Sequence, residues 1–311
     1  MSSAAAAPPD ILLRIVARRR ERLAEHHARH PEAATAVPPL AVESTLPGAV
    51  LTARDNRFLA ALSRRTAPGA ATAAHPGPAS PPAPAIIAEV KMGSPRLGSL
   101  HGRVDAAAQA RIYAENGAAA LSVVVEPDFF HGSYEILAVC RAASGLPAIA
   151  KDFVVDPLQL VWARQAGADA VLLIAALHQP EELAGYAWLA RGLGLVPLVE
   201  THDAEDLARL AGEPWELVGI NNRDLRTFEV DLERSIALLP WLPPAALKVA
   251  ESGIRDALDV ALLADSGFDA LPIGESLLLA ADPGAALRAL LGQPSGPGRA
   301  AAAPHGLVSR E

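Results

Sequence analysis

The chain has 311 residues, 51% of them hydrophobic, which is enough for a large buried core. Its net charge of -8 argues against a nucleic-acid partner or an anionic membrane surface, because both favour a basic face. The single cysteine, Cys140, cannot form an intramolecular disulfide, and neither a transmembrane run nor a signal-peptide pattern is present, so we expect a cytoplasmic protein.

Residues 1–65 are predicted to form a disordered leader followed by an N-terminal helical extension. Met1–Pro9 is rich in Ala, Ser and Pro, a composition typical of disorder. Apolar residues at helical spacing predict a helix over Ile11–Arg29 and a second, shorter one over Arg57–Arg65. The basic run Arg18–Arg22 is most simply a solvent-exposed face of the first helix.

Composition also marks two segments with little capacity to fold. Residues 66–85 consist almost entirely of Ala, Pro, Gly, Ser and Thr, so they are predicted to be a flexible insertion. Residues 293–311 are predicted to be a disordered tail for the same reason. The main folded domain is therefore expected to span residues 86–292.

Short apolar runs alternate with helical stretches throughout this domain, a pattern that predicts βαβ units and a parallel sheet. Polar residues end the runs all along the series instead of clustering at one switch point, which favours an α/β fold of the closed (β/α)₈ TIM-barrel type over an open doubly wound sheet. The predicted strands are Ile86–Val90, Ala120–Val125, Ala148–Lys151, Ala170–Ile174, Val196–Glu200, Leu217–Asn221, Lys248–Glu251 and Ala270–Gly274.

The short strand that ends in Lys151 is the most informative of these runs. A buried ammonium costs several kcal/mol unless it is paired or neutralised, so an acidic partner is expected to face Lys151. Other strands also end in polar residues, and Glu200 is one candidate partner. The alternative is a structural lysine paired to Asp152 or to a neighbouring strand.

Two pairs of residues lie two positions apart at strand ends and therefore point to the same side of an extended chain. Glu89 and Lys91 form the first pair, for which a surface ion pair is the alternative interpretation. Asn221 and Arg223 form the second, and an arginine fork is suited to a planar carboxylate. Their joint occurrence at one end of a barrel favours an active site.

Glycine-containing turns follow the last two strands, where phosphate-binding barrels place backbone amides. They are Glu251-Ser252-Gly253 and Gly274-Glu275-Ser276, although each alone is also compatible with an ordinary tight turn. No metal-ligand spacing, Walker loop or dinucleotide fingerprint is present. We therefore predict chemistry without a metal or cofactor, on a small phosphorylated substrate.

A set of motifs in this order resembles the indole-3-glycerol-phosphate synthase family over about residues 11–291. They are Ile87-Ala-Glu-Val-Lys91 with Ser94-Pro95, Phe129-Phe130 with Gly132-Ser133, Lys151-Asp152-Phe153, Leu198-Val-Glu200, Gly219-Ile-Asn-Asn-Arg-Asp224, Glu251-Ser-Gly253 and Gly274-Glu-Ser276. The resemblance implies a (β/α)₈ lyase of tryptophan biosynthesis. Such an enzyme closes and decarboxylates 1-(2-carboxyphenylamino)-1-deoxyribulose 5-phosphate.

The resemblance also implies roles for individual residues. Lys151 matches the family acid, and Glu89 and Glu200 match its acid–base carboxylates. The other implied catalytic positions are Lys91, Asn221, Glu251 and Ser252. The implied substrate-binding positions are Ser94, Phe130, Arg223, Gly253, Gly274, Glu275 and Ser276, with a core role equally compatible with Phe130.

Some residues depart from the family pattern, and two other functions stay open. Met92 and the pair Arg96-Leu97 replace more usual residues in the first loop, and Pro272 lies inside the last strand, where it removes a hydrogen-bond donor or forces a bulge. The alternatives are another phosphate-binding barrel enzyme, such as phosphoribosylanthranilate isomerase, and a non-catalytic scaffold paralogue. Protein partners are not predictable from the sequence.

Overall fold

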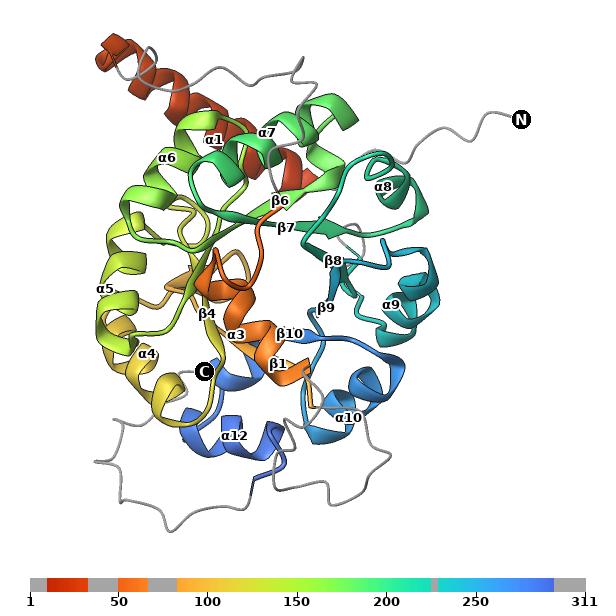
Figure 1. Cartoon of the computed structure of the whole chain (residues 1–311). Helices are drawn as coiled ribbons and strands as arrows, with labels where there is room; N and C mark the ends of the chain where they lie inside the picture. Colours follow the sequence, from red (N-terminus) through yellow and green to blue (C-terminus); the bar gives the residue numbers. More distant parts are fainter. Residues whose placement is uncertain (1–9, 33–49, 67–82, 225–228, 294–311) are drawn as a thin grey trace.

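The chain folds into a closed barrel of eight parallel strands surrounded by helices (Figure 1). The computed structural model describes residues 10–32, 50–66, 83–224 and 229–293. The strand order around the barrel is β1-β10-β9-β8-β7-β6-β5-β4, and β1 closes the circle by pairing with both β10 and β4. The predicted (β/α)₈ TIM-barrel fold is confirmed.

The barrel strands lie within a residue or two of their predicted positions. They are β1 (Ala85–Val90), β4 (Ala120–Val124), β5 (Ala148–Lys151), β6 (Ala170–Ile174), β7 (Val196–Thr201), β8 (Leu217–Asn221), β9 (Leu247–Glu251) and β10 (Ala270–Ile273). A small hairpin that was not predicted follows β1 and consists of β2 (Gly93–Ser94) and β3 (Gly98–Ser99).

Helices precede the barrel and connect its strands. They are α1 (Asp10–Arg29), α3 (Arg57–Thr66), α4 (Ala106–Glu115), α5 (Tyr134–Ser144), α6 (Pro157–Gln165), α7 (Pro180–Gly192), α8 (Ala204–Ala208), α9 (Leu232–Leu238), α10 (Ala257–Ser266), α11 (Glu275–Leu278) and α12 (Pro283–Leu290), with 3₁₀ turns η1 (Ala175–Leu177) and η2 (Leu239–Trp241). Aspartate or serine side chains cap many of them, as Ser133 caps α5 and Asp156 caps α6.

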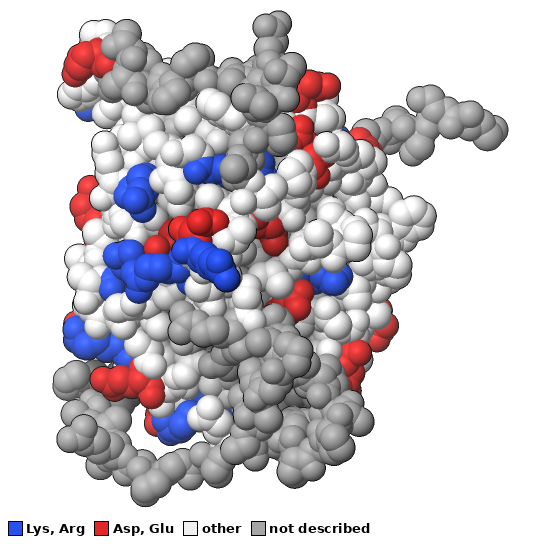
Figure 2. Space-filling view, in the orientation of Figure 1, with Lys and Arg blue, Asp and Glu red and all other residues white. Residues whose placement is uncertain are grey.

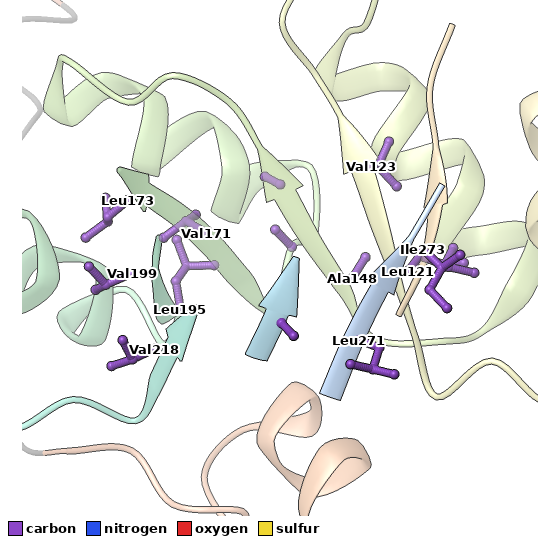
Figure 3. Close-up of a cluster of buried hydrophobic side chains, with 14 of the residues drawn as sticks. Leu121, Val123, Ala148, Val171, Leu173, Leu195, Val199, Val218, Leu271 and Ile273 are labelled. Carbon is purple, nitrogen blue, oxygen red and sulfur yellow. The ribbon is translucent and has the colours of Figure 1, made fainter. Parts of the chain in front are cut away.

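Alternate residues of each strand face two different cores, because successive side chains of a strand point to opposite sides. The outward set packs against the surrounding helices and includes Leu121, Val123, Val171 and Leu173 (Figure 3). The inward set fills the barrel, with Ile149 on β5 as a member. Every strand is thus buried on both faces, as parallel barrel strands require.

Helix α3 closes the amino-terminal end of the barrel. Its side chains Phe58, Leu59 and Leu62 belong to the same core as the inward strand residues. Asn56 caps this helix by accepting hydrogen bonds from the Phe58 and Leu59 amides. Its side-chain amide also donates to the Asp169 carbonyl at 2.7 Å, which fixes the helix to the barrel. The opposite, carboxyl-terminal end therefore remains for a site.

Helix α1 is held in part by a buried charge. The prediction of a solvent-exposed basic face was wrong for Arg19, whereas Arg20 and Arg22 are exposed. Arg19 is only 4% exposed. Its Nε and Nη2 atoms donate to Asp152 Oδ1 and Oδ2 at 3.1 and 2.5 Å, respectively. Arg18 and Arg22 contact Asp128 in the loop after β4. Arg18, Arg19 and Arg22 therefore attach the extension to the carboxyl-terminal end of the barrel.

The predicted insertion, residues 66–85, includes one folded residue at each end. Thr66 still belongs to α3, and Ala85 is a buried residue of β1, so both boundary residues are part of folded elements. The remainder of that segment, the predicted leader Met1–Pro9 and all but Gln293 of the predicted tail lie outside the described residues.

Strand β10 accommodates Pro272 without losing register. Pro272 is paired with Ile87 of β1 in an unbroken series from Ala270 to Ile273. Pairing with β9 is limited to Ala270, which precedes the proline. The proline therefore lies beyond the paired part of the β9 edge, and a bulge against β1 is not needed.

Basic and acidic side chains are interspersed on the face of the molecule shown in Figure 2, where groups of Lys and Arg border Asp and Glu. This face therefore presents no uniform basic surface. In the described parts of the chain, none of the helices combines the length and apolarity needed to cross a bilayer.

The Arg19–Asp152 pair yields a stability prediction. Replacing Arg19 by Ala leaves a buried carboxylate without its counter-ion, so we expect the free energy of unfolding to fall by about 3–5 kcal/mol. Urea denaturation measures the change. The exposed neighbour Arg20 provides the matched control, because Arg20→Ala should change stability by less than about 0.5 kcal/mol. Equal effects of the two substitutions would contradict a structural role for the buried pair.

Candidate active site

The inward-facing positions of the strands turn from apolar to polar at the carboxyl-terminal end of the barrel. On β1 the inward residue Ile87 is followed, two positions later, by Glu89, and on β5 Ile149 is followed by Lys151. On β7 the same spacing takes Leu198 to Glu200. The barrel interior therefore ends in a layer of charged side chains above its apolar core.

Lys151 and Glu89 form the centre of this layer. The Lys151 ammonium lies 3.3 Å from Glu89 Oε2 and 4.0 Å from Glu251 Oε2. Lys91 Nζ contacts the other oxygen of Glu89 at 2.9 Å. The alternative pairing of Lys151 with Asp152 is not what the structure contains, because Asp152 binds Arg19. Two ammonium groups therefore share one carboxylate at the mouth of the barrel.

These contacts set the protonation states. Burial alone would raise the pKa of Glu89, but Lys91 and Lys151 outweigh it and lower the pKa to about 2. Burial likewise lowers the pKa of Lys151, yet Glu89, Glu251 and Glu200 hold it well above its usual value. At neutral pH the site therefore contains an ammonium that can donate a proton and a carboxylate that is ionised.

Two adjacent carboxyl groups, Glu200 and Glu251, lie beside the Lys151–Glu89 pair. Glu200 is 4% exposed and accepts a hydrogen bond from Asn221 Nδ2 at 3.2 Å. Burial raises the pKa of Glu200, but contact with His202 reverses this and lowers it to about 2. Burial and the charge of Glu200 raise the pKa of Glu251 to about 8. Two adjacent carboxyl groups thus have widely separated proton affinities, the arrangement expected of an acid–base site.

These groups open into a cavity of about 860 Å³ at the carboxyl-terminal end of the barrel. Most predicted site residues contribute to its wall. They are Glu89, Lys91, Lys151, Arg223, Glu251, Ser252, Gly253, Gly274, Glu275 and Ser276. Asn221 and Glu200 lie in the same network but do not line the cavity.

The two glycine turns are shaped by close approaches. Gly253 has a left-handed φ of 84°, and a Cβ there would overlap the Val230 side chain. A Cβ on Gly274 would overlap the Glu89 carboxylate. Ser276 Oγ donates to the Ile254 carbonyl at 3.1 Å and so connects the two turns. Both turns need glycine because neighbouring side chains occupy the Cβ position.

Glu275 joins the second turn to other parts of the cavity wall. Its carboxylate forms an ion pair with Arg96 of the β2–β3 hairpin and lies 3.9 Å from Arg223 Nη2. Arg96 is exposed, so this contact contributes little stability but brings the hairpin to the rim of the cavity.

Two predicted substrate-binding residues are not in the cavity wall. Ser94 Oγ accepts a hydrogen bond from the Leu97 amide within the hairpin. The Phe130 ring packs 6.1 Å from that of Phe153, in the loop after β4. Their roles in substrate binding stay predictions.

Sequence reasoning missed three contributions to the site. His202 contacts Glu200 Oε1 at 3.2 Å, and Arg96 lines the cavity. An apolar part of the wall comes from Val230, Leu232 and Leu279. The signal for His202 was present, because it lies two positions after Glu200, the spacing that identified the Glu89–Lys91 pair.

The fold and the site together define a (β/α)₈-barrel enzyme with acid–base side chains at the carboxyl ends of its strands. The sequence profile of indole-3-glycerol phosphate synthase matches residues 77–290. The chain is 47% identical over 206 residues to indole-3-glycerol phosphate synthase of Rhodopirellula baltica, a match that covers 66% of this chain and 80% of that protein. It is 43% identical over 262 residues to the Azoarcus enzyme of the same name, with 84% and 94% covered. The chain belongs to the indole-3-glycerol phosphate synthase family.

Similar solved structures support the fold alone. The 3-hexulose-6-phosphate synthase of Salmonella typhimurium superimposes with a TM-score of 0.52 at 15% identity, covering 66% of this chain and 96% of that one. This level of identity shows a shared barrel architecture, whereas function is argued from the site.

Gly274 provides a steric test of the site. We expect Gly274→Ala to fold normally but to lose at least about tenfold in kcat, because the new methyl group displaces Glu89 from its two lysines. Steady-state kinetics and circular dichroism measure the two effects. Gly192→Ala on α7 is the matched control, since nothing lies within 4 Å of its added Cβ. Full activity in Gly274→Ala would show that the position of Glu89 is unimportant.

Proposed function

We propose that the chain converts 1-(2-carboxyphenylamino)-1-deoxyribulose 5-phosphate to indole-3-glycerol phosphate, carbon dioxide and water. The observation that carries this proposal is the Lys151 ammonium, held between Glu89 and Glu251 at the mouth of the barrel, in a chain of this family. The reaction needs a proton donor at the substrate carbonyl and a base nearby, and this arrangement supplies both.

Lys151 is proposed as the general acid. A ring carbon of the anthranilate moiety attacks the ribulose carbonyl, whose oxygen becomes a hydroxyl and later leaves as water. Each of these changes is favoured by a proton donor at that oxygen. The charge of Lys151 is maintained by Glu89, Glu251 and Glu200, and its ammonium faces the cavity.

Glu89 and Glu200 are proposed as the acid–base carboxylates. Both are ionised at neutral pH because each contacts a cation, Lys91 and Lys151 in one case and His202 in the other. Loss of carbon dioxide from the attacked ring carbon restores the aromatic ring. Loss of water then removes the hydroxyl group together with a proton from the methylene carbon next to the nitrogen, and a carboxylate can accept that proton. Glu251, with a pKa raised to about 8, is proposed to retain a proton and to exchange it with this pair.

The two ends of the substrate are proposed to bind at two parts of the cavity wall that meet where Arg223 contacts Glu275. The backbone amides of the turns at Gly253 and Gly274 suit the phosphate, with Glu275 and Ser276 beside them. Ser94 is proposed to contact the same phosphate from the hairpin.

The anthranilate end is proposed to bind beside the cationic groups Lys91 and Arg223 of the cavity wall. Lys91 suits the anthranilate carboxylate, and Asn221 orients Arg223 by accepting a hydrogen bond from its backbone amide at 3.0 Å. Ser252 is proposed to complete this part of the wall, and Phe130 to shield the ring from solvent.

The remaining predictions concern the cofactor, the cellular location and the partners of the protein. Action without a cofactor, a cytoplasmic location and the absence of a nucleic-acid partner stay predictions from the single cysteine, the acidic net charge and the motif search.

Replacing Lys151 by Met tests the reaction and the acid together. We expect the variant to fold, because apolar bulk is retained, and to lose at least about 100-fold in kcat, the contribution typical of a general acid. Indole fluorescence with the carboxyphenylamino substrate is the assay. Lys248→Met is the matched control, because Lys248 faces away from the barrel interior at the start of β9.

The assay also separates the alternatives. Turnover of phosphoribosylanthranilate by the wild type, with none of the carboxyphenylamino substrate, would favour the isomerase. Binding without turnover would favour a scaffold paralogue. Unchanged turnover in a folded Lys151→Met variant would reject this lysine as the acid.

A further inference from the structure

His202 lies directly after β7 and bridges two carboxylates. Its Nε2 atom is 3.2 Å from Glu200 Oε1, and its Nδ1 atom is 3.2 Å from Asp206 Oδ2. The side chain is 12% exposed. The Nδ1 contact is a hydrogen bond, whereas Nε2 lies at ion-pair distance from Glu200 without forming one. Because both ring nitrogens face carboxylate oxygens, the position suits an imidazolium, whereas a neutral ring would turn a lone pair toward one of these oxygens.

Asp206 is fixed in place by the short helix α8. It is 5% exposed, and its Oδ2 also accepts the His202 backbone amide at 2.9 Å. The backbone amide of Asp206 donates a hydrogen bond to the side chain of Asp203, the cap of α8, at 2.9 Å. Arg209 Nε lies 3.7 Å from Asp206 Oδ1, on the side away from the imidazole. The carboxylate is therefore fixed where it orients the ring toward Glu200.

On the other side, Glu200 faces a crowded set of groups. Its Oε1 atom lies 3.2 Å from His202 Nε2 and accepts a hydrogen bond from the Asn221 side-chain amide. Lys151 acts on it as a more distant cation, and Glu251 as a neighbouring acid. From the barrel centre to α8, the groups are therefore the Lys151 ammonium, the Glu251 carboxyl group, the Glu200 carboxylate, the His202 imidazolium and the Asp206 carboxylate. The His202 cation thus lies between two carboxylates.

We propose that His202 is a positioning residue of this enzyme, which remains an imidazolium and keeps Glu200 ionised and aimed into the site. The proposal rests on the role given to Glu200 under the proposed function. His202 does not line the substrate cavity, so its effect on the reaction is transmitted through Glu200 and the neighbouring Glu251.

Removing the cation reverses the balance between the two adjacent carboxyl groups. Burial lowers the pKa of His202, but Asp206 and Glu200 outweigh it and raise the pKa to about 10, so the charge persists throughout the neutral range. Without it, Glu200 and Glu251 are two buried acids with one nearby lysine. Their shared proton then settles on Glu200 at a higher pH, and the base is lost.

The pH profile of His202→Gln tests this consequence. Glutamine keeps an amide donor but no charge, so we expect the acid limb of kcat to move at least about one unit to higher pH, with KM nearly unchanged. On the acid limb, kcat then falls at least about tenfold below the wild type. A merely structural role would lower activity equally at all pH values and leave the limb in place.

His178→Gln is the matched control. His178 is likewise a buried histidine after a barrel strand, and it contacts Glu182 four residues later at 3.4 Å, but no carboxylate of the site. Its substitution should leave the acid limb where it is in the wild type. An equal shift in both variants would show a general effect of losing a buried imidazole and would overturn the proposal.

A measurement without substrate separates this proposal from the proposed function. In ¹⁵N spectra of histidine-labelled wild type, with His202 assigned by difference from His202→Gln or from Asp206→Asn, both ring nitrogens should remain protonated at pH 8. Asp206→Asn should lower the pH at which the ring titrates. A neutral ring at pH 7 overturns the role of His202 whether or not the protein makes indole-3-glycerol phosphate. Inactivity toward the carboxyphenylamino substrate, with a charged ring, counts against the proposed function alone.

Discussion

The neutralisation of Lys151 inside the barrel is the constraint on which the site depends. An ammonium in the barrel interior is stable only with a carboxylate close by, and Glu89 provides it at 3.3 Å, with the carboxyl group of Glu251 at 4.0 Å. Those carboxylates need space that other strands must leave empty. Gly274 leaves it for Glu89, and Gly219 leaves it for Glu251, because a Cβ at either position would overlap a carboxylate oxygen. One charge therefore determines residues on several strands.

The barrel and its central charges are predictable from the sequence because they follow a period of two. In a strand buried on both faces, an apolar run that ends in a charge places that charge at the barrel mouth, which is how Lys151 and Glu200 were found. The same period places Glu89 beside Lys91. The turns at Gly253 and Gly274 were predictable because their position after the last two strands carries information that an isolated glycine lacks.

Other features were not predictable, because they depend on contacts between distant segments. The run Arg18–Arg22 reads as a solvated face, and only the approach of Asp152 and Asp128 shows that it is a binding surface for the barrel. The spacing of His202 from Glu200 indicates that both face the same side of the chain, but it does not reveal Asp206 on the other side of the ring. Sequence spacing reveals which side of a strand a residue faces, but not which charge lies opposite.

The attachment of the N-terminal extension has a consequence for the order of folding. Helices α1 and α3 are synthesised before any strand, yet Arg19 is 133 residues from Asp152 and Asn56 is 113 residues from Asp169. Neither helix can dock until about half of the barrel strands exist. Contacts between residues so far apart in the sequence slow folding, because the entropy of closing the loop is lost before the contacts can stabilise the chain. Phe58 and Leu62 therefore lack their inner-core partners on β5 and β6 until those strands have been synthesised.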